Sequence, residues 1–108
     1  MKFLPYLKWQ KENFPDCCLK GYGCYGNVQQ HHVVAVGMGN NRKKDLPEHF
    51  TVISLCAKHH AELHQSGLVA GFNSFEQVVR QLMIYFHEME INKLLDEEFR
   101  NIDYRKGE

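Results

Sequence analysis

The sequence contains no long hydrophobic run, and this absence limits the class of protein that it can encode. No apolar stretch within its 108 residues approaches the roughly 20 residues that a helix needs to cross a bilayer. The opening segment, MKFLPYLKWQKENF, lacks the apolar stretch and small-residue cleavage site of a signal peptide. We therefore expect a cytoplasmic protein without membrane contact. Because disulfides are rare in the cytoplasm, the cysteines should be thiols, metal ligands or core residues.

The chain also lacks an excess of charge of either sign, with 13 Lys and Arg against 13 Asp and Glu. The balance hides an asymmetry. Residues 1–60 hold eight basic and four acidic residues, whereas residues 61–108 hold five basic and nine acidic residues. A basic half can bind a polyanion, although an ordinary solvated surface has the same composition. Hydrophobic residues make up 44% and charged residues 24%, which is typical of one globular domain.

Repeats and low-complexity tracts are absent as well, so we interpret residues 1–108 as a single domain. Residues 1–16 mix aromatic and basic side chains around two prolines, which predicts an irregular arm or a short helix packed on the domain. Residues 17–30 are rich in cysteine and glycine, a composition typical of tight turns. HHVVAV (residues 31–36) and FTVIS (residues 50–54) predict two strands.

A loop over residues 37–45 would join these strands as a hairpin, and two helices would follow. Residues 55–65 have a helical period, and Gly67 should end that helix. The second helix would occupy residues 74–100, with Ser74 and Gln77 forming a capping box. Apolar residues at spacings of three and four should face the core, with a partner-binding face as the alternative. These residues are Phe75, Val78, Val79, Leu82, Phe86 and Met89.

The most informative stretch is LCAKHHAELH, residues 55–64, which holds one cysteine and three histidines. His60 and His64 are four residues apart, so on a helix their imidazoles lie about 6 Å apart on one face and can share a cation. Cys56 and His59 are three apart and share a face rotated by about 100° from the first. One short helix can therefore supply ligands to two metal sites.

Cys56 and His59 need two more ligands to complete a tetrahedral zinc site. Cys24 is one candidate, and either Cys17 or Cys18 is the other. Buried apolar thiols would explain a lone cysteine, but four cysteines beside a histidine cluster favour zinc.

His31 and His32 should point to opposite faces of the first strand, because side chains alternate along a strand. If one of them joins His60 and His64 on a cation, the other is free to act as an acid or base, with an unperturbed pKa of about 6.5. The alternative is a solvated strand end.

The order of these features resembles the HNH nucleases, also called the ββα-metal or His-Me finger group. The matching features are a cysteine pair, HHV on a strand, a basic loop beginning GMG, a second strand, and LCxxHHxxLH on a helix. Within this group the chain more closely resembles phage-encoded members, including recombination-enhancement nucleases. The HxxxH pair on the helix also resembles that of DNase colicin domains. The resemblance covers residues 17–68. It implies an α+β fold: a small zinc-stabilised ββα-metal finger with an N-terminal arm and a long C-terminal helix.

The resemblance also implies roles for single residues. His32 would be the general base, and His31, His60 and His64 would bind the catalytic divalent cation (Mg²⁺, Mn²⁺ or Ni²⁺). The Cys56 and His59 pair resembles the zinc-binding CxxC of other members.

The family's asparagine, which braces the hairpin loop, corresponds to Thr51, and Asp45 or Asn41 could substitute for it. The basic loop supplies candidate DNA contacts, for which a solvated loop is the alternative. These are Arg42, Lys43 and Lys44.

The implied function is hydrolysis of phosphodiester bonds in DNA by a phage-encoded HNH endonuclease, in the cytoplasm of an infected or prophage-bearing bacterium. One alternative is a non-catalytic, zinc-stabilised module that binds nucleic acid. Another is a structural or packaging protein that dimerises through its C-terminal helix. Recombination or packaging proteins are candidate partners.

Overall fold

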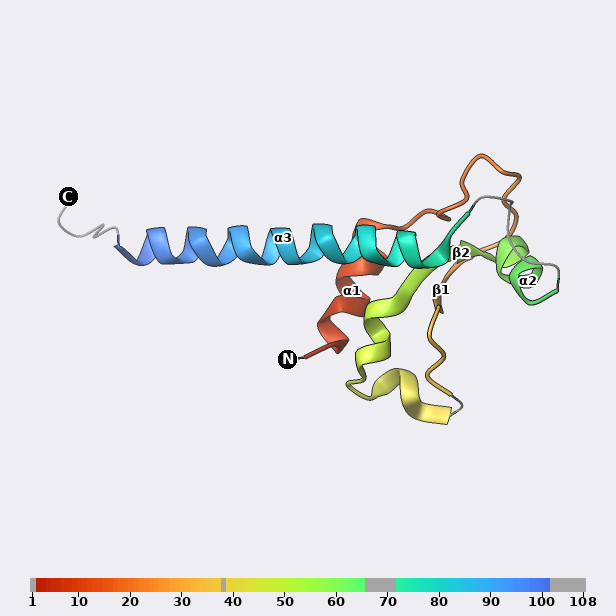
Figure 1. Ribbon diagram of the computed structural model, residues 1–108, viewed down its shortest axis with the longest axis horizontal. Helices are drawn as coiled ribbons and strands as arrows, with labels where there is room; N and C mark the ends of the chain where they lie inside the picture. Colours follow the sequence, from red (N-terminus) through yellow and green to blue (C-terminus); the bar gives the residue numbers. More distant parts are fainter. Residues whose placement is uncertain (1, 38, 66–71, 102–108) are drawn as a thin grey trace.

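The computed structural model describes residues 2–37, 39–65 and 72–101, which form a small α+β structure (Figure 1). This fold confirms the predicted class, with a two-stranded sheet, a helix at each end of the described chain and one helix directly after the second strand. Residues 1–16 were predicted as an irregular arm or a short packed helix, and the structure has the helix. The helices and strands are α1 (Leu4–Asn13), β1 (Val28–His32), β2 (Val52–Cys56), α2 (Ala57–Gln65) and α3 (Ser74–Asn101), with 3-10 helices η1 (Gly39–Lys43) and η2 (Pro47–Thr51) between the strands.

The strands form the predicted antiparallel hairpin, but both are shifted from their predicted bounds. β1 starts at Val28, three residues before the predicted strand HHVVAV. β2 starts at Val52, two residues after the start of the predicted strand FTVIS. The reason is η2, which begins at Pro47 and occupies the chain until Thr51. Pairing therefore starts at Val52, whose partner is His32. The upstream residues VQQHH, rather than HHVVAV, complete the ladder.

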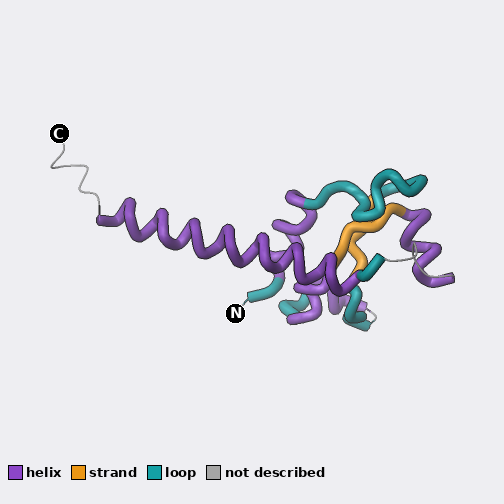
Figure 2. Tube along the Cα trace, turned by 45° about the horizontal axis from the view of Figure 1, so that its top comes forward, coloured by secondary structure: helices purple, strands orange, loops and turns teal. Residues whose placement is uncertain are grey.

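Strand β2 is the centre of the core, because each of its residues is buried. Figure 2 shows the hairpin between the start of α3 and α2. Val52 packs with Tyr6 of α1 and Tyr85 of α3 in one apolar cluster. A second apolar cluster adjoins the hairpin and the cysteine-rich loop, and consists of Cys17, Leu19, Ile53, Leu55, Cys56 and Val78.

A buried network of amides joins four elements and fixes their positions. Gln10 of α1 donates to Ser54 Oγ on β2 at 2.9 Å, and accepts from Gln30 of β1 at 2.8 Å. Gln81 of α3 donates to the Val52 carbonyl at 2.6 Å. Because buried amides need partners, this network specifies how α1 and α3 sit on the sheet.

Helix α3 extends well beyond the rest of the molecule (Figure 1). The extents of 64 × 32 × 22 Å and the radius of gyration of 17.9 Å reflect this projection, because a compact chain of 100 residues has a radius near 13 Å. Asn73 caps the helix by accepting from the Phe75 and Glu76 N–H groups, so the predicted capping box at Ser74 is wrong. No helix in the described part of the chain has the length and hydropathy needed to cross a bilayer.

The predicted core face of α3 is only partly covered. Val78 is buried and Leu82 is half-buried, but Phe75 and Val79 are 61% and 54% exposed. The sheet, α1 and η2 contact the side of α3 that carries Val78, Gln81 and Tyr85. Together they are too small to cover the adjoining side of this helix. Phe86 and Met89 are also exposed. The predicted helix end at Gly67 lies outside the described residues.

Candidate functional site

The first metal cluster joins Cys17, Cys24, Cys56 and His59, whose ligand atoms all lie within 4.8 Å of one another. The Nδ1 atom of His59 lies 3.5, 3.6 and 3.1 Å from the sulfurs of Cys17, Cys24 and Cys56. Zinc ligands in tetrahedral geometry, at about 2.3 Å for sulfur and 2.0–2.1 Å for nitrogen, lie about 3.5 Å apart. The cluster therefore fits a zinc ion. Of the two candidates for its fourth ligand, Cys17 is in the cluster and Cys18 is not.

Groups around this cluster prepare His59 and the sulfurs for a metal. His59 Nε2 donates to the Tyr22 carbonyl at 3.2 Å, so its Nδ1 keeps the lone pair. Backbone N–H groups of Leu19 and His59 point at the Cys17 and Cys56 sulfurs, each at 3.4 Å. These contacts stabilise thiolates, which are the form that binds zinc.

The thiols differ in their readiness to ionise. Burial opposes ionisation of Cys56, but hydrogen bonds, first from the His59 backbone, lower its pKa to about 6. Desolvation and the neighbouring Cys17 and Cys56 sulfurs raise the pKa of Cys24 to about 11. Burial and repulsion from Cys17 raise the pKa of Cys18 to about 12. A bound cation would therefore be needed to hold Cys24 as a thiolate at neutral pH.

The second cluster brings together His31 of β1 with His60 and His64 of α2. The ring centroid of His31 lies 5.0 Å from that of His60 and 5.8 Å from that of His64. One nitrogen from each ring lies within 4.8 Å of the others. A shared cation would be bound at about 2.0–2.1 Å from each nitrogen. His64 is exposed and His31 and His60 are half-buried, so the side chains have room to adjust.

The environment of this cluster favours neutral imidazoles, the form that binds metals. Burial, followed by the neighbouring His60 and His64, lowers the pKa of His31 to about 4. Burial and then His64 also lower the pKa of His60. Gln29 Oε1 lies 3.1 Å from His60 Nδ1 and can only accept, so His60 donates there and keeps its Nε2 lone pair for a ligand.

His32 points away from this cluster, as the alternation along the strand predicts, and meets His49 of η2. His32 Nε2 lies 3.0 Å from His49 Nδ1, and His49 Nε2 contacts the Lys44 carbonyl. Because a carbonyl only accepts, His49 carries its proton on Nε2. A neutral His49 then accepts at Nδ1 from His32 Nε2–H, so His32 keeps its lone pair at Nδ1.

The free nitrogen of His32 is covered in this structure. The side chain is 6% exposed, and Nδ1 is buried with no hydrogen-bond partner among the described residues. Burial, followed by Arg42, lowers the pKa of His32 to about 4. Sequence reasoning missed His49, because a single histidine between Pro47 and Thr51 carries no spacing signal. Only the folded loop brings it to His32.

The loop between the strands is braced at Thr51. Its hydroxyl donates to the Glu48 carbonyl at 2.7 Å and accepts from the Val34 N–H at 3.1 Å. Asn41 donates to the Val36 carbonyl within the same loop. Asp45 instead accepts from the Leu4 and Phe3 N–H groups at the start of α1, and these bonds hold its pKa below the usual range.

The basic residues of the loop are exposed. Arg42 donates to the Gln30 carbonyl at 3.3 Å, which holds its guanidinium beside β1. Lys43 and Lys44 are exposed next to it.

Comparison of the chain with protein-family models, curated proteins and solved structures finds no match.

Proposed function

We propose that this protein is a metal-dependent endonuclease of the HNH type that hydrolyses phosphodiester bonds in DNA. The observation that supports it is the meeting of His31, His60 and His64 at one point, together with a separate cluster formed by Cys17, Cys24, Cys56 and His59. We propose a phage-encoded enzyme of recombination or DNA processing that acts in the bacterial cytoplasm.

In the proposed reaction, water attacks phosphorus and the bond to the 3′ oxygen breaks. His32 Nδ1 accepts the proton of the attacking water, and this step requires the covered nitrogen to become accessible when substrate binds. A divalent cation (Mg²⁺, Mn²⁺ or Ni²⁺) held by the three histidines would supply charge stabilisation for the phosphate and the leaving oxygen. Arg42, Lys43 and Lys44 would contact backbone phosphates.

The cysteine cluster would have a structural role. With zinc bound, Cys17 and Cys24 of the loop would be tied to Cys56 at the end of β2 and to His59 of α2. This would fix α2 against the hairpin and so position His60 and His64 opposite His31.

The test is a plasmid-nicking assay with magnesium, manganese or nickel. His32→Ala and His64→Ala should lower the cleavage rate at least about 100-fold, the lower end of what a general acid or base contributes. The matched control is His87→Ala, because His87 is an exposed histidine on α3, away from both clusters. Absence of cleavage with every cation, or equal rates for His32→Ala and His87→Ala, would contradict the enzyme proposal.

The burial of His32 favours a second candidate, a non-catalytic, zinc-stabilised module that binds nucleic acid. In that case the His32–His49 contact would serve only to hold the hairpin loop. A protein that contains one zinc ion, binds DNA, takes up no second cation and never cuts would be this module.

A further inference from the structure

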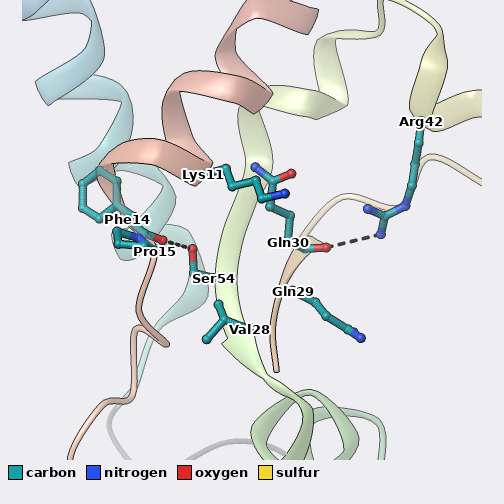
Figure 3. A pocket seen from close by; sticks show the side chains of 8 residues that line it. All are labelled: Lys11, Phe14, Pro15, Val28, Gln29, Gln30, Arg42 and Ser54. Carbon is teal, nitrogen blue, oxygen red and sulfur yellow. Dashed lines mark hydrogen bonds between the residues drawn. The ribbon is translucent and has the colours of Figure 1, made fainter. Parts of the chain in front are cut away.

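A groove of about 490 Å³ lies beside β1, between the end of α1 and η1 (Figure 3). Its volume is within the range of small-ligand and cofactor sites, about 300–1,000 Å³. Four segments distant in the sequence supply its walls, and its lining includes Lys11, Phe14, Gln29, Arg42 and Ser54.

The charged side chains that line this groove, Lys11 and Arg42, are both cationic. Figure 3 shows them entering from different elements, with Gln30 between them. Arg42 is oriented by its bond to the Gln30 carbonyl, at 3.3 Å. The ion pairs found within the described ranges use Lys8, Lys20 and Lys58. Lys11 and Arg42 are therefore available to an anion.

Gln29 connects the groove to the second metal cluster. Gln29 lines the groove, and its side-chain oxygen accepts from His60 Nδ1 at 3.1 Å. A nucleic-acid strand with one phosphate at the histidine cluster would therefore have its next nucleotide beside β1. Phe14 at the end of α1 supplies an apolar wall for the sugar or base.

We propose that this groove binds the nucleotide adjacent to the scissile phosphate, with that nucleotide's own phosphate between Lys11 and Arg42. The inference rests on the proposed function, because it takes the bound strand to be the substrate. Two cations without a carboxylate in the same lining are the charge complement of a phosphodiester. The contact is to the backbone and carries no sequence preference. Helix α1 would thus be part of the substrate site rather than only a support for the sheet.

Binding of a fluorescently labelled single-stranded DNA of about 12 nucleotides, a typical single-strand site size, tests this by anisotropy. The full-length, zinc-loaded protein is used without added magnesium, manganese or nickel, so that binding is measured apart from cleavage. Lys11→Gln and Arg42→Gln should each weaken binding roughly 3- to 10-fold. Each should also make the slope of log K against log salt shallower by about 0.7.

The matched control is Lys8→Gln. Lys8 is on the same helix, its side chain is 83% exposed, and it pairs with Glu12 rather than lining the groove. Equal affinities and salt slopes for Lys11→Gln and Lys8→Gln, or no binding of DNA at all, would overturn the groove proposal. If the protein cuts DNA while Lys11→Gln keeps the wild-type slope, the groove proposal fails alone. If Lys11→Gln weakens binding in a protein that never cuts, the nuclease proposal fails, and the groove stands only as a nucleotide-binding site without a scissile phosphate beside it.

Discussion

At the scale of single residues, His49 determines which nitrogen of His32 is free. It contacts His32 through Nδ1 and the Lys44 carbonyl through Nε2, and it is fully buried. The interaction needs one acceptor and one donor on the same side chain. This requirement can be tested with two substitutions of similar size.

His49→Phe should lower the free energy of unfolding by about 1–3 kcal/mol, because it leaves the His32 Nε2–H and the Lys44 carbonyl without partners. His49→Gln should lose less, since an amide both accepts and donates. Urea denaturation of the two variants measures the difference. Equal losses would show that the polar contacts at this position contribute nothing beyond volume.

The histidines also predict how stability depends on pH. Burial lowers the pKa of both His31 and His32 to about 4, whereas an unfolded histidine titrates near 6.5. Between these values the unfolded chain binds more protons than the folded chain, so the free energy of unfolding should fall as pH drops from about 6.5 to about 4. Urea denaturation across this window should give a smaller pH dependence for His31→Gln than for the wild-type protein. Cys56, whose pKa is about 6, also titrates here, but it is common to both proteins. An unchanged pH dependence would contradict the prediction.

At the scale of the elements, the cysteine-rich turn approaches the start of α2 closely at Gly26. A Cβ at this position would lie 2.6 Å from Ala57 Cβ, and the backbone φ is +86°. Gly26→Ala should therefore destabilise the protein by about 2–5 kcal/mol, combining overpacking and left-handed strain. Gly21→Ala is the control, because its φ is +97° but nothing lies within 4 Å. Thermal denaturation of both variants isolates the clash, and equal melting temperatures would exclude it.

The same turn supplies two of the cluster's ligands, and a pair of cysteine variants tests which ones. Cys24→Ser should reduce bound zinc to well below one ion per chain, because the exposed Cys24 is part of the cluster. Cys18→Ser should keep a full ion, since Cys18 lies outside it. Zinc content after dialysis, measured by atomic emission, distinguishes the two. Loss of zinc in both variants, or in Cys18→Ser alone, would contradict the assignment.

At the scale of the whole molecule, the predictable features are those set by local spacing. The three-residue interval of Cys56 and His59, and the four-residue interval of His60 and His64, predict two pairs of ligands on different faces. Cys56 is the last residue of β2 rather than part of the predicted helix, but it directly precedes α2 and still meets His59. The alternation of His31 and His32 likewise follows from the strand alone. These local rules predict which side chains share a face. They left open the choice between His31 and His32, which the family resemblance made, and the choice between Cys17 and Cys18.

Features that depend on distant partners could not be predicted. The hairpin register is fixed by η2, and His49 reaches His32 only through the folded loop. Nothing in the sequence around Gln10 and Gln81 marks them as buried, because their partners on β2 are reached only when α1 and α3 pack on the sheet. One side of α3 is exposed because the rest of the fold is too small to cover it, and no local sequence pattern predicts that size. Pairing of α3 with a second copy of the chain stays a prediction.

We propose that the imidazoles of His31, His60 and His64 converge on one cation, at a site separate from the cysteine cluster. Crystals grown with zinc and soaked in manganese test it directly, through anomalous scattering at wavelengths that distinguish the two metals. We expect zinc at the cluster of Cys17, Cys24, Cys56 and His59, and manganese bound by His31, His60 and His64. Zinc at the first cluster with no metal between the three histidines would contradict it.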